Sequence, residues 1–128
     1  MSSGGVVSGS DRAGTIVSGT RSEGRVGPQP WPTDLPDGWP LALAGQVVAD
    51  TRTDGDRLLL VDVRESRRET VEAYADALRA EGFRVEVGER EGTPALRAIG
   101  GSARAELTFF AGETVTRVEI LFPSAAAG

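Results

Sequence analysis

Asp62 and Tyr74 are the two side chains whose types and positions best suit proton chemistry. Asp62 interrupts the apolar run LLLVDV, and a carboxylate held under cover there could act as a general acid or base. Tyr74 is the only tyrosine, and a phenol can donate a proton. The sequence nevertheless favours structural roles: an ion pair of Asp62 with Arg64 or another neighbour, and a core position for Tyr74 with its hydroxyl at the edge.

Several side-chain types that commonly carry catalysis are missing. The chain contains no histidine, cysteine or lysine, which excludes an imidazole base, a thiolate nucleophile and a Schiff-base amine. Ser66 has only carboxylates as conceivable bases, and its position directly before a helix suits a helix cap. An enzyme built from this chain would therefore depend on its shape and on carboxylate chemistry.

The turn DTRTDGD places Asp50, Asp54 and Asp56 close together, as a calcium-binding loop does. The spacing does not fit an EF-hand, because Arg52 stands at loop position 3, where a ligand is required, and Val61 where the bidentate glutamate belongs. We expect a polar hairpin tip and no metal site. The glycine-rich stretches GGVVSG and IGGSARAE lack the features of nucleotide-binding loops, so we expect no cofactor.

Charge limits the classes of partner. The formal net charge is -5, and acidic residues alternate with basic ones, whereas a nucleic-acid-binding surface needs clustered basic residues. Nearby glutamates dilute the arginines around the expected helix start, which favours a solvated face there. These arginines are Arg57, Arg64, Arg67 and Arg68. We expect a protein partner or a small molecule as the ligand and no nucleic acid, and the sequence gives no oligomeric state.

The sequence shows neither a membrane span nor a signal peptide. No apolar run approaches the roughly 18 residues that suggest a span. The first residues, MSSGGVVSGSDRAG, lack a basic start and a long apolar segment. As given, the chain is expected in the cytoplasm; if an export signal was removed upstream, the cell envelope or the exterior is expected instead.

Composition divides the chain into a tail, a domain and a short end. Residues 1–30 are rich in Gly, Ser, Thr, Asp and Arg, which predicts a flexible tail, with a weak hairpin around SGSDRAG as the alternative. Residues 31–123 are expected to form one domain, and residues 124–128 a C-terminal tail. The 39% hydrophobic and 26% charged residues are typical of a globular protein.

Residues 28–40, PQPWPTDLPDGWP, carry five prolines and both tryptophans, and we call this segment the strap. Proline restricts its own backbone and that of the preceding residue, so the strap should be extended. Trp31 and Trp39 could offer a binding surface, or they could pin the strap to the domain. The sequence favours the second interpretation, because a buried aromatic ring removes a large apolar area from water.

An Asp54-Gly55 pair between two β-rich runs predicts a β-hairpin. A two-residue turn would place Val48 opposite Val61. A three-residue turn would instead bring Val47 and Ala49 to the face of Val61 and Val63. The second register alternates better, but the sequence leaves both open.

A helix is predicted between Ser66 and Gly82. Ser66 and Glu69 form a capping-box pattern, and Gly82 suits the residue that ends a helix. Between them, apolar residues recur at i, i+3, i+4 and i+7, which makes one stripe. The stripe consists of Val71, Tyr74, Ala75 and Leu78. Because the stripe is narrow, the helix should lie on a surface.

Alternation of apolar and polar residues predicts a strand after the helix in FRVEV. PALRAIG is a weaker strand, because Leu96 and Ile99 are out of phase, and it is followed by two further strands, ARAELTFF and TVTRVEILF. The last two should pair around a Gly112-Glu113 turn, which places Phe109 opposite Thr116, Leu107 opposite Val118 and Ala105 opposite Ile120. These six side chains would then share one face, as a correct register requires.

The same register predicts a polar outer face of arginine and glutamate. Glu106 would lie opposite Glu119, and the diagonal neighbours Arg104 and Arg117 would offset the like charges. We therefore expect Arg104 and Arg117 to be binding residues of this face.

The element order β-β-α-β-β-β-β predicts an α+β fold, with one helix packed on one face of an antiparallel sheet. In residues 31–122 the pattern resembles a small uncharacterised domain of bacterial lipoproteins and envelope-associated proteins. The resemblance rests on the strap, the first hairpin and a helix that carries Glu69, Tyr74, Leu78, Gly82 and Phe83. It implies a fold and no activity, and this chain lacks the lipobox cysteine of those proteins.

Every motif found in this sequence explains the fold, and the strongest catalytic side chains are missing. We therefore expect a non-catalytic binding or interaction module that uses the outer Arg/Glu face or the strap. The alternative is a small cofactor-free enzyme of the isomerase or cyclase type, with Asp62 or Tyr74 directed into a pocket between helix and sheet.

Overall fold

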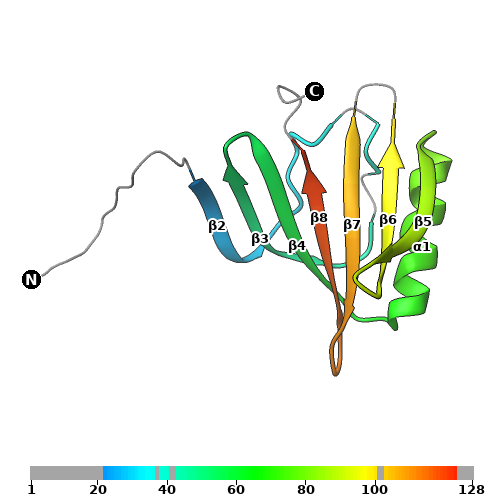
Figure 1. The fold of residues 1–128 in the computed structure, drawn as a ribbon. Coiled ribbons are helices and arrows are strands. Elements are labelled where there is room, and N and C mark those ends of the chain that lie inside the picture. The colour runs from blue at the N-terminus through cyan, green and yellow to red at the C-terminus, as the bar shows by residue number, and fades with distance from the viewer. Residues whose placement is uncertain (1–21, 37, 41–42, 101–102, 124–128) are drawn as a thin grey trace, which may run out of the picture.

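A computed structural model describes residues 22–36, 38–40, 43–100 and 103–123. These residues form a seven-stranded antiparallel sheet and one helix (Figure 1). The elements are β2 (Ser22–Gln29), β3 (Gln46–Thr53), β4 (Asp56–Val63), α1 (Arg67–Ala80), β5 (Arg84–Arg90), β6 (Thr93–Ile99), β7 (Arg104–Ala111) and β8 (Thr116–Phe122). The expected α+β class, with one helix on an antiparallel sheet, is confirmed.

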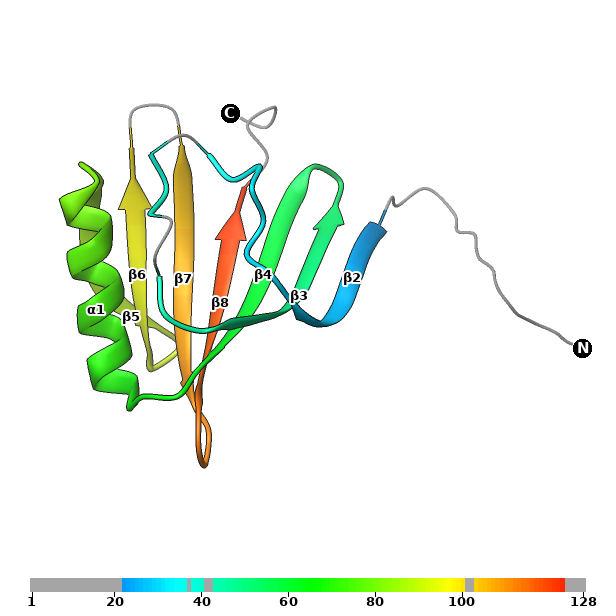
Figure 2. The same cartoon turned by 180° about the vertical axis from the view of Figure 1, so that it is seen from behind.

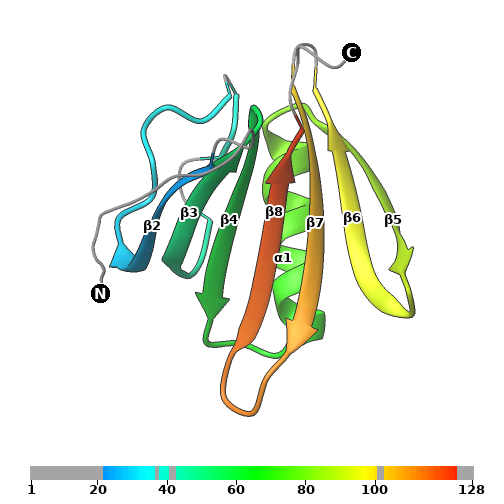
Figure 3. The same ribbon diagram turned by 60° about the vertical axis from the view of Figure 1, so that its left-hand side comes forward.

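The strands lie in the order β2-β3-β4-β8-β7-β6-β5. The last strand, β8, is therefore central and joins the hairpin that precedes α1 to the meander that follows it. The helix packs over β5, β6 and β7, and the strap crosses the same side of the sheet (Figure 2). Figure 3 shows the helix behind β7 and β8 and leaves the other side of the sheet in front. We call the side with helix and strap the covered face, and the opposite side the open face.

The structure corrects the predicted tail over residues 22–29, while residues 1–21 lie outside the described residues. Ser22–Gln29 is an edge strand that pairs with β3, so three strands precede the helix instead of two. The sequence does not predict this strand, because Gly24, Gly27 and Pro28 have low strand propensity. An edge strand tolerates Pro28, since one of its sides needs no backbone donor, and Gly27 has a φ of 114° near an irregularity in the register. The alternative hairpin around SGSDRAG and the tail at residues 124–128 lie outside the described residues.

The Asp54-Gly55 turn combines features of both registers. Thr53 pairs with Asp56, so the turn has two residues, and the positive φ of Asp54 (53°) and Gly55 (91°) is that of a type I′ turn. Further from the turn, a bulge between Val47 and Ala49 shifts the pairing by one residue and places Val47 opposite Val61. The bulge thus places Val47 on the covered face with Val61, whereas Ala49 pairs with Leu60.

The signals at both ends of the helix are confirmed. The Ser66 side chain accepts from the Glu69 backbone N–H, and the Glu69 carboxylate accepts from the Ser66 backbone N–H, which completes the capping box. At the other end Gly82 has a φ of 96°, and Phe83 N–H donates to the Leu78 carbonyl in a Schellman motif. Tyr74, Ala75 and Leu78 of the predicted stripe are buried, and Val71 is partly buried.

The predicted register of β7 and β8 is wrong by two residues. Phe109 pairs with Val118 instead of Thr116, and a four-residue loop from Gly112 to Val115 replaces the predicted two-residue turn. Side chains alternate with a period of two, so a shift of two residues leaves every side chain on its predicted face. All six predicted inward residues of the two strands are accordingly buried.

The core lies between the covered face and the layer made by the helix and the strap. Tyr74 of α1 packs edge-on against Phe109 of β7, with ring centroids 5.8 Å apart. Trp39 of the strap packs edge-on against Phe83 and Phe122, at 5.7 and 4.9 Å. The helix and the strap therefore act as one layer over the sheet.

Candidate functional site

Asp62 lies on the open face in an ion pair with Arg117. Arg117 Nε donates to Asp62 Oδ1 at 2.7 Å, and Arg117 Nη2 donates to Asp62 Oδ2 at 3.0 Å. This bidentate pair raises the pKa of the Arg117 guanidinium. The sequence favours an ion pair of Asp62 with Arg64 or another neighbour, and in the structure that neighbour is Arg117. The two residues face each other across β4 and β8.

Tyr74 is fully buried on the opposite side of the sheet. Its hydroxyl donates to the Ala44 carbonyl at 2.6 Å, which ties the helix to the segment before β3. Burial, reinforced by the negative charge of Glu65, raises the pKa of the phenol well above its ordinary value. Tyr74 therefore occupies the core position that the sequence favoured.

The two tryptophans of the strap have different surroundings. Trp39 is only 4% exposed, and among the described residues its indole N–H has no hydrogen-bond acceptor. Trp31 is partly buried, and its indole N–H donates to the Gly45 carbonyl at 3.2 Å. Both side chains thus pin the strap to the domain, and Trp31 also lines a pocket beside it.

The outer Arg/Glu face exists, but its pairs differ from those expected. Glu106 lies opposite Leu121, and Glu119 lies opposite Thr108, so the like-charge pair of the predicted register does not form. Arg117 pairs with Asp62, and Arg104 is an exposed residue at the start of β7. Arg104 and Arg117 therefore do not offset a glutamate pair as we predicted.

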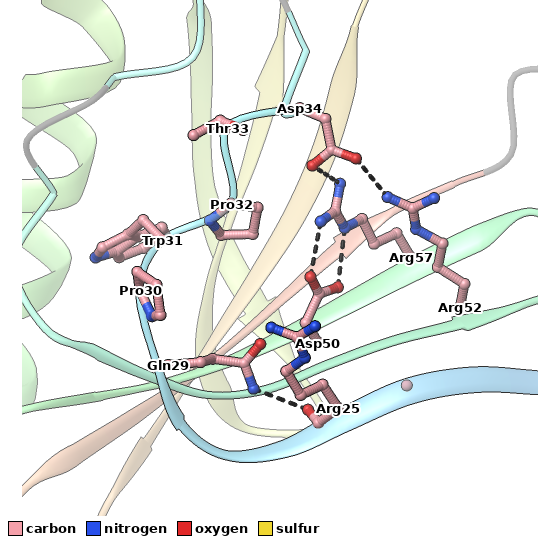
Figure 4. A pocket seen from close by; sticks show the side chains of 11 residues that line it. Arg25, Gln29, Pro30, Trp31, Pro32, Thr33, Asp34, Asp50, Arg52 and Arg57 are labelled. Atoms are coloured by element: carbon pink, nitrogen blue, oxygen red, sulfur yellow. Dashed lines mark hydrogen bonds and ion pairs between the residues drawn. The ribbon is translucent and has the colours of Figure 1, made fainter.

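A pocket of about 750 Å³ lies between the strap and strands β2, β3 and β4 (Figure 4). We call it the strap pocket. Its lining residues are Gly24, Arg25, Gln29, Pro30, Trp31, Pro32, Thr33, Asp34, Asp50, Arg52 and Arg57. The proline rings come from the strap and the charged side chains mostly from the strands, so the pocket has an apolar wall facing a charged one.

Arg57 is the centre of the charged wall. Its Nε and Nη2 donate to Asp50 at 2.9 and 2.7 Å, and its Nη1 lies 3.0 Å from Asp34 of the strap. The Arg57 side chain is 11% exposed and that of Asp50 is 19% exposed. The Asp50 carboxylate, and then that of Asp34, raise the pKa of Arg57. All three nitrogens of this guanidinium are thus engaged within the protein.

Arg52 and Arg25 lie nearer the solvent. Arg52 Nη2 donates to Asp34 at 2.7 Å, and this bond, with the contribution of Arg57, lowers the pKa of the Asp34 carboxyl. Arg25 extends from β2 into the pocket (Figure 4), and it pairs with no carboxylate of the described residues. The pocket thus contains two guanidiniums that still have N–H groups available.

Sequence reasoning did not find the strap pocket. The sequence suggests Asp50 only as a possible calcium ligand and Arg57 only as part of a solvated patch. Arg25 falls within the predicted tail, and the sequence gives Asp34 no role beyond its position in the strap. The available signal is the Asp54-Gly55 turn: a two-residue turn pairs Arg57 with Arg52, which makes Asp50 a diagonal neighbour of Arg57 on the same face and brings opposite charges within reach across the hairpin.

Comparisons with protein-family models, curated proteins and solved structures find no significant match for this chain. The resemblance to the lipoprotein-associated domain therefore stays a prediction. Within the part of the chain that the structure describes, no helix is long and apolar enough to cross a membrane. Among the same residues, no group of three or more His, Cys, Asp or Glu side chains is arranged to hold a metal ion.

Proposed function

We propose that this chain is a non-catalytic binding module and that the strap pocket is its ligand site. The observation that carries the proposal is the construction of the charged wall. Arg57 is held by Asp50 from β3 and by Asp34 from the strap, so the sheet and the strap are joined at the pocket itself. Binding sites of this kind combine an apolar wall with a few polar groups whose positions are fixed before the ligand arrives.

The positions of Asp62 and Tyr74 argue against the enzyme alternative. Asp62 is on the open face, and Tyr74 is on the covered side, so the sheet separates the two proton-carrying side chains. Each is also engaged, Asp62 with Arg117 and Tyr74 with the Ala44 carbonyl. A general acid and base must both reach one substrate, and these two residues cannot do so without unfolding the sheet.

The test is native mass spectrometry of the chain purified from its natural host, compared with two variants. Arg52→Trp places a bulky ring in the strap pocket, whereas Arg79→Trp makes the same change on the exposed side of the helix. A ligand mass that is present in the unaltered chain and in Arg79→Trp, but absent in Arg52→Trp, supports the proposal. A bare chain, or a ligand that all three proteins retain, contradicts it.

A further inference from the structure

The charges that line the strap pocket do not balance. Its wall holds the guanidiniums of Arg25, Arg52 and Arg57 and the carboxylates of Asp34 and Asp50, which leaves one positive charge. Both carboxylates bond to Arg57, and Arg52 shares Asp34 with it. The uncompensated charge therefore lies on the Arg25 and Arg52 side, where the pocket opens to solvent.

Arg25 and Arg52 are placed to act on one group. In the β2–β3 ladder Arg25 lies opposite Asp50, and Arg52 is two residues further along β3. Two residues with this diagonal relation share one face of a sheet, with Cβ atoms roughly 7–8 Å apart, which long side chains can span. The two guanidiniums can thus converge on a single small anion between them.

The residual charge selects among anions. One carboxylate would neutralise the pocket, whereas a phosphate carries about −1.5 to −2 charges and would leave an excess negative charge beside Asp34 and Asp50. A carboxylate is also planar and accepts two parallel N–H bonds from one guanidinium. Pro30 and Pro32 provide an apolar wall next to these donors, which suits the hydrocarbon part of such a ligand.

We propose that the strap pocket binds a carboxylate with an apolar stem, held by Arg25 and Arg52 while its stem packs on Pro30 and Pro32. This inference rests on the proposed function, because it names the ligand class of the same pocket. Asp50 and Asp34 engage Arg57 fully and keep the wall in place, so Arg57 positions the site and does not bind the ligand. The carboxylate can belong to a small acid or to a peptide.

The first experiment follows the arginine side-chain N–H signals by nuclear magnetic resonance during titrations. The probes are 3-phenylpropionate, the uncharged 3-phenylpropionamide and inorganic phosphate. We expect 3-phenylpropionate to shift the Arg25 and Arg52 signals in a saturable way and leave Arg79 unchanged, and we expect the amide and phosphate to bind at least about tenfold more weakly. Equal binding of acid and amide, preferential binding of phosphate, or no binding of the acid overturns the inference.

Variants then assign the contact. Arg25→Gln should weaken 3-phenylpropionate binding by about tenfold or more, because a charge-assisted hydrogen bond is lost. Arg79→Gln removes a half-exposed arginine of the helix that does not line the strap pocket and should leave the affinity unchanged. An unchanged affinity in Arg25→Gln contradicts the assignment.

A last pair of probes identifies the source of the carboxylate. A peptide ending in valine is titrated as the free acid and as the C-terminal amide. Binding of the free acid alone, more tightly than 3-phenylpropionate, indicates a peptide ligand, and weaker binding than 3-phenylpropionate indicates a small acid. A host-derived ligand that Arg52→Trp displaces, but that contains no carboxylate, would retain the proposed function and overturn only this inference.

Discussion

Arg57 and Asp50 form a bidentate ion pair, with N···O distances of 2.9 and 2.7 Å, in which neither side chain is more than one-fifth exposed. The pair spans the first hairpin, and a third nitrogen of Arg57 reaches the strap through Asp34. One guanidinium therefore connects β3, β4 and the strap. Its loss should affect stability as well as the pocket.

Replacing Arg57 by Gln should lower the free energy of unfolding by about 3 kcal/mol, because it leaves the largely buried Asp50 carboxylate without its partner. Urea unfolding at neutral pH measures the change. Arg52→Gln is the matched control, since the Arg52 side chain is half exposed and its pair with Asp34 should contribute less than about 1 kcal/mol. Equal losses in the two variants would show that Arg57 has no special structural role.

Tyr74 should make the protein sensitive to alkaline pH. Burial raises the pKa of its phenol above the ordinary value of 10.0, so its contribution to stability is complete below pH 10.0 and is lost as the pH rises above that value. Above pH 10.0 the free energy of unfolding should fall by up to about 1.4 kcal/mol per pH unit, until the pH reaches the pKa of Tyr74 in the folded protein. The chain has no lysine or cysteine and one tyrosine, so few other groups titrate there.

The prediction for Tyr74 is checked by measuring the free energy of unfolding from pH 8 to the highest pH at which the chain still folds. The ultraviolet absorbance of the phenolate reports ionisation of Tyr74 and should appear only when the protein unfolds. Tyr74→Phe should remove the alkaline slope. At neutral pH it should cost about 1–2 kcal/mol, because the Ala44 carbonyl loses its donor. An alkaline slope that persists in Tyr74→Phe would assign the effect to another group.

Gly45 should not tolerate a side chain. Its φ is 120°, and an added Cβ would lie 2.5 Å from Val61 Cγ1 and 2.8 Å from Val63 Cγ2. Gly45→Ala should therefore destabilise the protein by at least about 2 kcal/mol. Gly88→Ala, where an added Cβ meets no atom within 4 Å, should stay within about 0.5 kcal/mol of the unaltered chain. Thermal unfolding of the two variants compares them directly.

Deleting residues 1–30 should destabilise the domain, because it removes β2 and leaves the edge of β3 unpaired. We expect the melting temperature to fall by several degrees, since roughly 1 kcal/mol corresponds to about 4–8 °C in a domain of up to 100 residues. A chain that lacks only residues 1–21 is the control and separates the contribution of β2 from that of the preceding residues. No difference between the two shortened chains would make β2 dispensable.

The Asp62–Arg117 pair should contribute little, because it lies at the surface with side chains 24% and 47% exposed. Asp62→Asn should lower the free energy of unfolding by less than about 1 kcal/mol, and added salt should reduce this difference. A double-mutant cycle with Arg117→Gln isolates the pair. A stabilising effect of Asp62→Asn would instead indicate a strained carboxylate and would reopen the enzyme alternative.

The sequence by itself determined the features that depend on neighbouring residues. The Ser66 cap, the Gly82 stop and the Asp54-Gly55 turn each follow from hydrogen bonds or backbone angles within a few residues. The alternation in the last two strands likewise assigned each side chain to its correct face, because successive residues of a strand point to opposite faces whatever the exact pairing.

Only the tertiary structure decided the features that join distant residues. The edge strand β2 forms because β3 supplies its backbone partners, and nothing in its own glycine- and proline-containing sequence predicts it. The register of β7 and β8 depends on the loop from Gly112 to Val115 and on the neighbours β6 and β4. The alternation of apolar and polar residues could not determine this register, because a shift of two residues leaves the alternation unchanged. The strap pocket combines Arg25, Asp34 and Arg57, which the chain separates and the folded sheet brings together.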